Sequence, residues 1–414
     1  MHISLITSSC LAHQQISEVV VIQPILIVVG TRPEAIKLLP VYFACKRARL
    51  PVVLCTTSQH EELAQVVFKL FDVQCDYDLH VMKPKQDLFY VTQAVLGKIK
   101  EVLLAVKPSM VLVQGDTTTS MAASLAAFYA QIPIGHVEAG LRTHDMNSPF
   151  PEEMNRRFIS LVAEYHFAPT AAATANILTQ GVHRDNVFCV GNTVVDALQY
   201  ILTKINAGSM VVASSINDII SFAQKQSYSI VLLTMHRRES FNGGIDRVLS
   251  TIKETLDKHP QMFIIFPYHP NPAVKEAIAR TQFSEHERVH VCQALAYHDL
   301  VYVLSASDWV MTDSGGLQEE ATSLGKPTLV LRNNTERMES VWAGMSYIVG
   351  TDREKIISGV ALMNKGIVVV AQYQNLYGDG HAAEKIALIL MQKLAQPSGY
   401  ASSIVPEISL NQVL

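Results

Sequence analysis

Short runs of apolar, mostly β-branched residues alternate with segments of helical period from residue 25 to about residue 350. Runs that are apolar at nearly every position are typical of parallel strands covered on both faces by helices. They predict strands at residues 25–29, 52–56, 110–114, 132–137, 165–168 and 187–190, and again at 230–234, 263–267, 289–292, 309–312, 328–331 and 347–349. The predicted fold class is therefore α/β, with doubly wound parallel sheets.

The strand pattern breaks between residues 206 and 227, a stretch that contains Ser and Asn and has no strand character. A chain of 414 residues is also too long for one ordinary core. Both observations predict two doubly wound domains joined near residues 192–205. We expect an extension at 1–22, a first domain at 23–195, a second at 196–380 and a tail at 397–414.

Polar clusters follow the predicted strands at their carboxyl ends, where open parallel sheets gather their working groups. Because the clusters come from both halves, they predict one cleft between the two domains. They are Gly30-Thr31-Arg32, Gly115-Asp116-Thr117, Glu138-Ala139-Gly140, His236-Arg237-Arg238 and Asp313-Ser314-Gly315-Gly316.

Composition narrows the class of protein. The chain is 49% apolar and 17% charged with a net charge of −4, which favours a globular protein without a broad footprint for nucleic acid or an anionic membrane. No run reaches the ~20 apolar residues of a membrane span. No Lys or Arg precedes Arg32, and the six cysteines form no C-x-x-C pair. We therefore expect a cytoplasmic protein.

The run from Asp313 to Glu320 lies between a predicted strand and a predicted helix. Gly315 and Gly316 let a ligand approach the backbone, and a helix amino terminus offers free N–H groups to a phosphate. The Glu320 carboxylate is placed to accept hydrogen bonds from a ribose diol. The alternative is a helix that is only capped by Ser314.

Three arginines, Arg32, Arg237 and Arg337, adjoin predicted strand ends. Guanidinium groups suit bidentate contacts with phosphate, whereas a lone arginine is more often a solvated surface charge. Their placement together with the glycine turn favours a cleft that binds a diphosphate.

Carboxylates supply the candidate chemistry. Asp116 follows one strand and either acts in that chemistry or caps the next helix, a role that Thr117 can also fill. Glu138 follows another strand, where partial burial raises a carboxyl pKa. Glu152 and Arg156 stand at i and i+4 of a predicted helix and can form an ordinary ion pair, as can the neighbouring Glu153 and Arg157.

Common cofactor and metal signatures are missing. The chain has no G-x-G-x-x-G fingerprint for a dinucleotide, and its 15 histidines show no metal-ligand spacing. We therefore expect neither NAD nor a metal ion as a cofactor.

The combined motifs resemble those of the non-hydrolysing UDP-N-acetylglucosamine 2-epimerases over roughly residues 24–390. The opening motif is the run from Gly30 to Lys37, GTRPEAIK. The match continues at residues 115–119 (GDTTT), 136–142 (HVEAGLR), 151–153 (PEE), 191–193 (GNT), 236–240 (HRRES), 313–316 (DSGG), 324–327 (LGKP), 335–337 (TER) and 377–380 (YGDG).

The resemblance implies a glycosyltransferase-B-like fold of two Rossmann-like domains, with a last helix at about 381–396 that packs back on the first domain. It implies a homodimer that reversibly converts UDP-N-acetylglucosamine (UDP-GlcNAc) to UDP-N-acetylmannosamine (UDP-ManNAc), which supplies cell-surface polysaccharide. The family's reaction is anti-elimination of UDP to 2-acetamidoglucal followed by re-addition.

Family roles carry over to matching residues. The implied catalytic set is Asp116, Glu138, Glu152, Arg156 and His236. The implied substrate-binding set is Arg32, Lys37, Leu300, Ser314, Gly315, Gly316, Glu320 and Arg337, where Leu300 replaces an aromatic that stacks on uracil in some members. Some members bind a second UDP-GlcNAc as an activator, at positions matched by Gln59, His60, Gln86, Arg237 and His269.

Two other functions fit a cleft of this kind. A glycosyltransferase of the same fold would use a UDP-sugar as donor, but it would also need an acceptor. A non-catalytic sensor of sugar nucleotides would keep the arginines and glycines without needing Asp116, Glu138 and Glu152.

Overall fold

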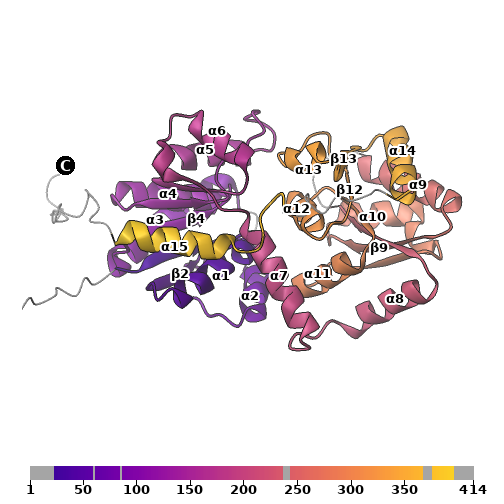
Figure 1. The fold of residues 1–414 in the computed structure, drawn as a ribbon, viewed down its shortest axis with the longest axis horizontal. Helices are drawn as coiled ribbons and strands as arrows, with labels where there is room; N and C mark the ends of the chain where they lie inside the picture. Colours follow the sequence, from indigo (N-terminus) through magenta and orange to yellow (C-terminus); the bar gives the residue numbers. More distant parts are fainter. Residues whose placement is uncertain (1–22, 59–60, 84–85, 236–242, 367–374, 396–414) are drawn as a thin grey trace, which may run out of the picture.

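The protein is described by a computed structural model that covers residues 23–58, 61–83, 86–235, 243–366 and 375–395. It consists of two lobes side by side, each built on one parallel sheet with helices on its faces (Figure 1). The predicted α/β class with doubly wound parallel sheets is confirmed.

The first lobe has a seven-stranded sheet in the order β3-β2-β1-β4-β5-β6-β7. Its strands are β1 (Ile25–Val29), β2 (Val52–Thr56), β3 (Tyr77–Asp78), β4 (Met110–Gln114), β5 (Ile134–Val137), β6 (Tyr165–Ala168) and β7 (Val187–Cys189). Its helices are α1 (Arg32–Arg47), α2 (Glu61–Leu70), α3 (Leu88–Val106), α4 (Thr118–Tyr129), α5 (Glu152–Val162) and α6 (Ala171–Leu178).

The second lobe has a six-stranded sheet in the order β10-β9-β8-β11-β12-β13. Its strands are β8 (Ser229–Thr234), β9 (Met262–Tyr268), β10 (Val289–Gln293), β11 (Trp309–Thr312), β12 (Thr328–Val330) and β13 (Ser346–Ile348). Its helices are α8 (Ser214–Lys225), α9 (Gly244–Lys258), α10 (Pro272–Thr281), α11 (Tyr297–Ala306), α12 (Gly315–Ser323), α13 (Met338–Trp342) and α14 (Arg353–Asn364).

All twelve predicted strands are present, and their observed ends lie within about two residues of the predicted ones. The sequence pattern missed β3, which pairs with β2 through only two residues and is too short to give a periodic signal. The strands of both sheets pair in parallel, as expected from their continuous burial.

Two segments connect the lobes. Helix α7 (Thr193–Asn206) packs against α1 of the first lobe and against α11 and α12 of the second. The chain returns through Tyr377, whose carbonyl accepts a hydrogen bond from the Asn192 N–H at 2.6 Å. The last helix, α15 (Ala382–Leu394), packs on α1 and α7 (Figure 1). The limits of the domains themselves stay a prediction.

The core of the first lobe lies on both faces of its sheet. Helices α3, α4 and α5 contribute buried apolar side chains to one face, with Ile99 and Ile159 among them. Helices α1, α7 and α15 cover the other face, and their core is continuous with apolar residues of α11 and α12.

None of the helices in the described part of the chain has the length and apolar composition of a membrane span.

The strand order of the two sheets determines where the predicted site residues lie. In the first sheet β1, β4 and β5 are neighbours, and in the second β8, β11 and β12 are neighbours. The connections that leave β1, β4, β5 and β11 carry four of the polar clusters predicted from the sequence, and the cluster at 236–238 lies outside the described residues. In each sheet the central pair, β1 with β4 and β8 with β11, is also where the strand order reverses, the usual ligand position in such folds.

Candidate active site

A cavity of about 360 Å³ lies between the two lobes, at the carboxyl ends of these central strands. It brings together residues that are hundreds of positions apart in the chain. Among the predicted catalytic and substrate-binding residues, those that line it are Arg32, Lys37, Asp116, Glu138, Glu152, Arg156, Leu300, Ser314, Gly315, Gly316, Glu320 and Arg337. His236 lies outside the described residues.

Glu138 follows β5 in a left-handed backbone conformation, with φ of 64°. Its carboxylate is buried and accepts hydrogen bonds from Lys37 Nζ at 2.5 Å, from Asn192 Nδ2 at 2.8 Å and from the Gln114 amide. Burial opposes ionisation of Glu138, but the Lys37 and Arg337 cations outweigh it and hold the pKa below its usual value. The raised pKa expected from burial alone is therefore wrong, because the sequence pattern does not show these two cations. The geometry therefore presents an ionised carboxylate at neutral pH.

Asp116 stands in the turn after β4. Its carboxylate pairs with Arg156 Nη2 at 2.5 Å, and Arg156 is almost fully buried. The cap of α4 is Thr117, whose hydroxyl accepts from the Ser120 N–H at 3.0 Å. The capping role considered for Asp116 is thus filled by its neighbour, and the Asp116 side chain is left facing the cavity.

Helix α5 supplies the third carboxylate, Glu152, from its first position. The expected ion pair between Glu153 and Arg157 is present at 2.9 Å, but Glu153 is fully buried and also accepts from the Thr143 N–H. Arg156 reaches across to Asp116, so that it belongs to the wall of the cavity and not to the surface of the helix.

Glu34 was not predicted as a site residue, yet it joins the turns after β1 and β4. Its buried carboxylate accepts hydrogen bonds from the Gly30 N–H and from three hydroxyls, those of Thr31, Thr117 and Ser120. Burial raises the pKa of Glu34 although these donors act in the opposite direction. Glu34 is the acidic residue of the opening motif at residues 30–37, and its place there is the sequence feature that could have identified it.

In the second lobe, the turn after β11 opens helix α12. Ser314 caps this helix, since its hydroxyl accepts from the Leu317 N–H at 3.4 Å, and it also lines the cavity. A Cβ on Gly315 would lie 2.6 Å from Nη1 of Arg337, so this glycine lets the guanidinium lie on the backbone. At Gly316 a Cβ would meet no atom within 4 Å, and the turn is open there.

Two successive glutamates of α12 have different partners. Glu320 faces the cavity and accepts from the Tyr297 hydroxyl at 2.6 Å. Glu319 points away from it and accepts from Arg337 Nε at 3.0 Å and from Asn192 Nδ2 at 2.9 Å. Burial raises the pKa of each carboxyl group to about 7.

Of the predicted activator residues, only Gln86 and His269 are described. Neither lines the cavity between the lobes, and His269 Nδ1 accepts from the Asn271 N–H at 3.3 Å. Gln59, His60 and Arg237 lie outside the described residues. The activator site therefore stays a prediction.

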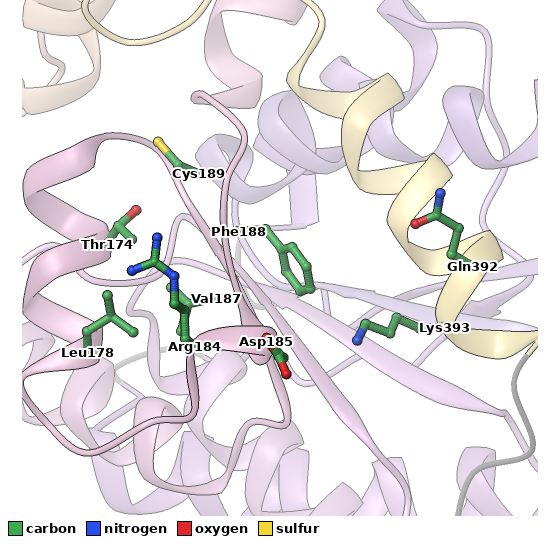
Figure 2. A pocket seen from close by; sticks show the side chains of 9 residues that line it. All are labelled: Thr174, Leu178, Arg184, Asp185, Val187, Phe188, Cys189, Gln392 and Lys393. Atoms are coloured by element: carbon green, nitrogen blue, oxygen red, sulfur yellow. The ribbon is translucent and has the colours of Figure 1, made fainter.

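A second hollow of about 560 Å³ lies beside the edge strand β7, between α6 and α15 (Figure 2). Its wall includes Arg184, Phe188 and Lys393, and it contains none of the predicted site residues. In the part of the chain that the structure describes, no three His, Cys, Asp or Glu side chains form a group that could hold a metal ion.

Comparison with known proteins points to one family. A sequence profile described as UDP-N-acetylglucosamine 2-epimerase matches residues 44–391. The chain is 42% identical over 367 residues to a probable UDP-N-acetylglucosamine 2-epimerase of Ralstonia solanacearum, a match that covers 87% of this chain and 97% of that protein. It is 41% identical over 372 residues to the UDP-N-acetylglucosamine 2-epimerase of Neisseria meningitidis, covering 89% and 99%.

Solved structures agree. The UDP-GlcNAc 2-epimerase of N. meningitidis bound to UDP-GlcNAc has a TM-score of 0.82 at 40% identity and covers 89% of this chain and 100% of that one. The Methanocaldococcus jannaschii enzyme in complex with UDP-GlcNAc and UDP has a TM-score of 0.76 at 31% identity, covering 89% and 99%. A glycosyltransferase of Rickettsia africae, 12% identical with a TM-score of 0.55, shares the fold alone. The predicted glycosyltransferase-B-like fold is thereby confirmed, and the chain belongs to the UDP-N-acetylglucosamine 2-epimerase family.

Proposed function

We propose that this protein interconverts UDP-GlcNAc and UDP-ManNAc by inverting the configuration at C2 of the sugar. The observation that carries the proposal is the cavity itself, where three carboxylates of the first lobe face the glycine turn and Arg337 of the second. Relatives at about 40% identity bear the epimerase name, and one of them is solved with UDP-GlcNAc bound.

The second lobe is suited to the nucleotide. Free N–H groups at the start of α12, together with the Ser314 hydroxyl, offer donors to a diphosphate. Arg32 and Arg337 line the same cavity and supply positive charge to it. Glu320, held by Tyr297, is placed to accept from the ribose hydroxyls, and Leu300 offers an apolar surface to the base.

The chemistry follows from the substrate. The C2–H bond of the sugar has no adjacent carbonyl, so direct deprotonation is difficult. In anti-elimination a carboxylate takes the C2 proton, the C–H electron pair forms the C1–C2 double bond, and the C1–O bond breaks with its electrons on UDP. A diphosphate oxygen of UDP then adds back to C1, and C2 receives a proton on its other face. Cations beside the diphosphate stabilise the charge that develops on UDP.

Asp116, Glu138 and Glu152 are the proposed acid and base groups. Lys37 and Arg337 keep Glu138 ionised, the state in which a carboxylate can accept a proton, and Arg156 fixes the direction of Asp116. The lowered pKa makes Glu138 a weak base as long as both cations face it. We also propose that His236 assists the departing phosphate.

We propose that the protein acts as a homodimer. Exposed apolar side chains gather at the carboxyl ends of the adjacent helices α3, α4 and α5, all more than half exposed: Leu104, Phe128, Tyr129 and Leu161. Helices that cover one face of a parallel sheet run in the same direction, so these ends lie at the same edge of the lobe. Apolar patches of this kind mark subunit contacts.

Further parts of the proposal rest on the family resemblance. A second UDP-GlcNAc would bind as an activator at the positions of Gln59, His60, Gln86, Arg237 and His269. The enzyme would act in the cytoplasm without NAD or a metal ion, and its product would supply cell-surface polysaccharide. The glycosyltransferase alternative needs an acceptor, and the three carboxylates in one cavity favour the epimerase over it.

Proton NMR of UDP-GlcNAc with the purified enzyme in heavy water tests the function. Conversion to UDP-ManNAc with deuterium at C2, in the absence of any acceptor and with a chelator present, is the expected result. Release of free UDP only when an acceptor sugar is added would instead support the glycosyltransferase.

A further inference from the structure

Asn192 stands where the chain first crosses between the lobes, between β7 and α7. Its side-chain Oδ1 accepts from the Val194 N–H at 3.1 Å and so caps α7. Its own backbone N–H donates to the Tyr377 carbonyl of the returning segment. Because Oδ1 is committed to the helix cap, the orientation of the amide is fixed, and the amide nitrogen must point the other way.

The Asn192 amide nitrogen bridges two carboxylates, one from each lobe. It donates to Glu138 Oε1 at 2.8 Å and to Glu319 Oε2 at 2.9 Å. All three side chains are buried. A neutral group with two N–H donors thus joins these two acidic groups directly without adding charge.

Arg337 completes the arrangement from the other side. Its Nε donates to the second oxygen of Glu319 at 3.0 Å, and its Nη2 lies 3.8 Å from Glu138 Oε1. Glu319 therefore divides its two oxygens between Asn192 and Arg337. Glu138, Asn192, Glu319 and Arg337 form a closed ring of polar contacts across the lobes.

The ring has an inner and an outer half. Glu138 and Arg337 line the cavity, whereas Asn192 and Glu319 do not. A substrate in the cavity would therefore meet the first two directly and the second two only through them. Since the side chains are buried and the charges paired, a change at Asn192 or Glu319 removes a hydrogen bond that Glu138 or Arg337 depends on.

We propose, resting on the function proposed above, that Asn192 and Glu319 are positioning residues that hold the Glu138 carboxylate and the Arg337 guanidinium at a fixed separation across the two lobes. The reaction needs a base at C2 and a cation at the leaving diphosphate at the same moment. A misplacement of about 1 Å between such groups can cost about 100-fold in rate.

Asn192→Ser is the first test, because serine caps a helix nearly as well as asparagine but cannot reach either carboxylate. We expect turnover of UDP-GlcNAc to fall by about 10- to 100-fold, with a small change in melting temperature. Asn192→Asp also keeps the cap and the shape, but it sets a third carboxylate against Glu138 and Glu319. Its turnover should be lower than that of Asn192→Ser.

Glu319→Gln is the second test. The Arg337 contact can be kept by the amide oxygen, but the amide nitrogen then faces the Asn192 nitrogen, two donors without an acceptor. Turnover should fall as in Asn192→Ser, and UDP affinity should also fall, because Arg337 loses the charged partner of its Nε and keeps only Glu336 and Glu138, which can draw the guanidinium out of place. Asp196→Asn is the matched control: Asp196 is buried, accepts from the N–H groups of Ala382 and Ala383, and does not line the cavity.

Each protein is assayed well below its own melting temperature, with the wild type in the same experiment. If the wild type itself does not convert UDP-GlcNAc, the proposed function fails. If the wild type is active and Asn192→Ser and Glu319→Gln turn over within about twofold of Asp196→Asn, the two residues are structural only and the inference is overturned. Equal turnover of Asn192→Asp and Asn192→Ser would also count against it, since a cap alone does not distinguish them.

Discussion

The two lobes place glutamates in the wall of one cavity, and these glutamates differ in charge. Glu138 of the first lobe faces Lys37 and Arg337 and has a lowered pKa. Glu320 of the second lobe is as deeply buried, but its nearest donor is the neutral Tyr297 hydroxyl, and burial raises its pKa to about 7. Burial is common to both, so neighbouring cations decide which carboxylate is ionised.

This difference matches the tasks proposed for the lobes. A carboxylate that takes a proton from carbon must be ionised at neutral pH, and Glu138 is. A carboxylate that accepts from a ribose diol has no such requirement. The first lobe therefore presents the ionised Glu138 carboxylate to the cavity. The second lobe presents a binding surface that includes Ser314, Gly316 and Glu320.

Glu138→Gln tests the first half of the comparison and has the largest expected effect. The amide keeps the shape but cannot accept a proton from C2, so turnover should fall by about 10²–10⁴-fold. Lys37 loses its buried partner, and the melting temperature should also fall. Turnover, UDP affinity and melting temperature are measured together. Near-normal turnover would remove Glu138 from the acid and base set and leave Asp116 and Glu152.

Glu320→Gln tests the other side of the comparison, the raised pKa of Glu320, through the pH dependence of protein stability. Burial raises the pKa of Glu320 to about 7 in the folded protein, from the 4.5 of a glutamate side chain exposed to water. The folded state holds this proton more tightly, so the cost of the buried charge is absent below 4.5 and complete above 7. As pH rises through this window, the wild type should lose on the order of 3 kcal/mol of unfolding free energy relative to the variant.

Urea unfolding of both proteins at several pH values measures this difference. Burial also raises the pKa of Glu319 to about 7, and Glu319 is present in both proteins, so subtracting the two curves removes most of its contribution. Curves that stay parallel from pH 5 to 8 would mean that Glu320 is ionised throughout, like Glu138.

The sequence predicted the strands that position the site better than it predicted the contacts between site residues. Strands were found because runs such as 25–29 and 309–312 are apolar throughout, and parallel topology then brings their carboxyl ends to one edge. Contacts such as Asn192 with Glu319 or Arg156 with Asp116 join residues 127 and 40 positions apart. No local period records such pairs, because they depend on how two lobes pack.

A similar limit applies to single residues. Asp116 was given two roles because Thr117 could also cap the helix, and only the structure shows that Thr117 does so. Glu34 and Tyr297 were not singled out at all, since an acidic first helical turn and an apolar helix face are ordinary features. Their partners come from other elements of the fold.

Gly316→Ala tests whether the backbone of the α12 turn contacts the phosphate groups of UDP. A methyl group there meets no protein atom within 4 Å, so the free protein should be as stable as the wild type. If a phosphate approaches this backbone, the methyl group blocks it, and the dissociation constant for UDP should rise about tenfold. Gly315→Ala should differ, because its methyl group displaces Arg337 in the free protein and lowers stability as well. Unchanged UDP affinity in Gly316→Ala would move the phosphate site elsewhere.

Ser314→Ala has the smallest expected effect and separates the two roles that the sequence left open. The 3.4 Å hydrogen bond to the Leu317 N–H is long, so loss of the cap should cost only about 0.5–1 kcal/mol of unfolding free energy. If the hydroxyl also donates to the diphosphate, UDP affinity should fall by a further ~5-fold, the effect of about one hydrogen bond. Thermal melting with and without UDP measures both quantities on one sample. A variant that loses stability equally with and without UDP would show Ser314 to be a cap alone, and the phosphate contacts of the second lobe would then rest on the backbone of α12 and on Arg337.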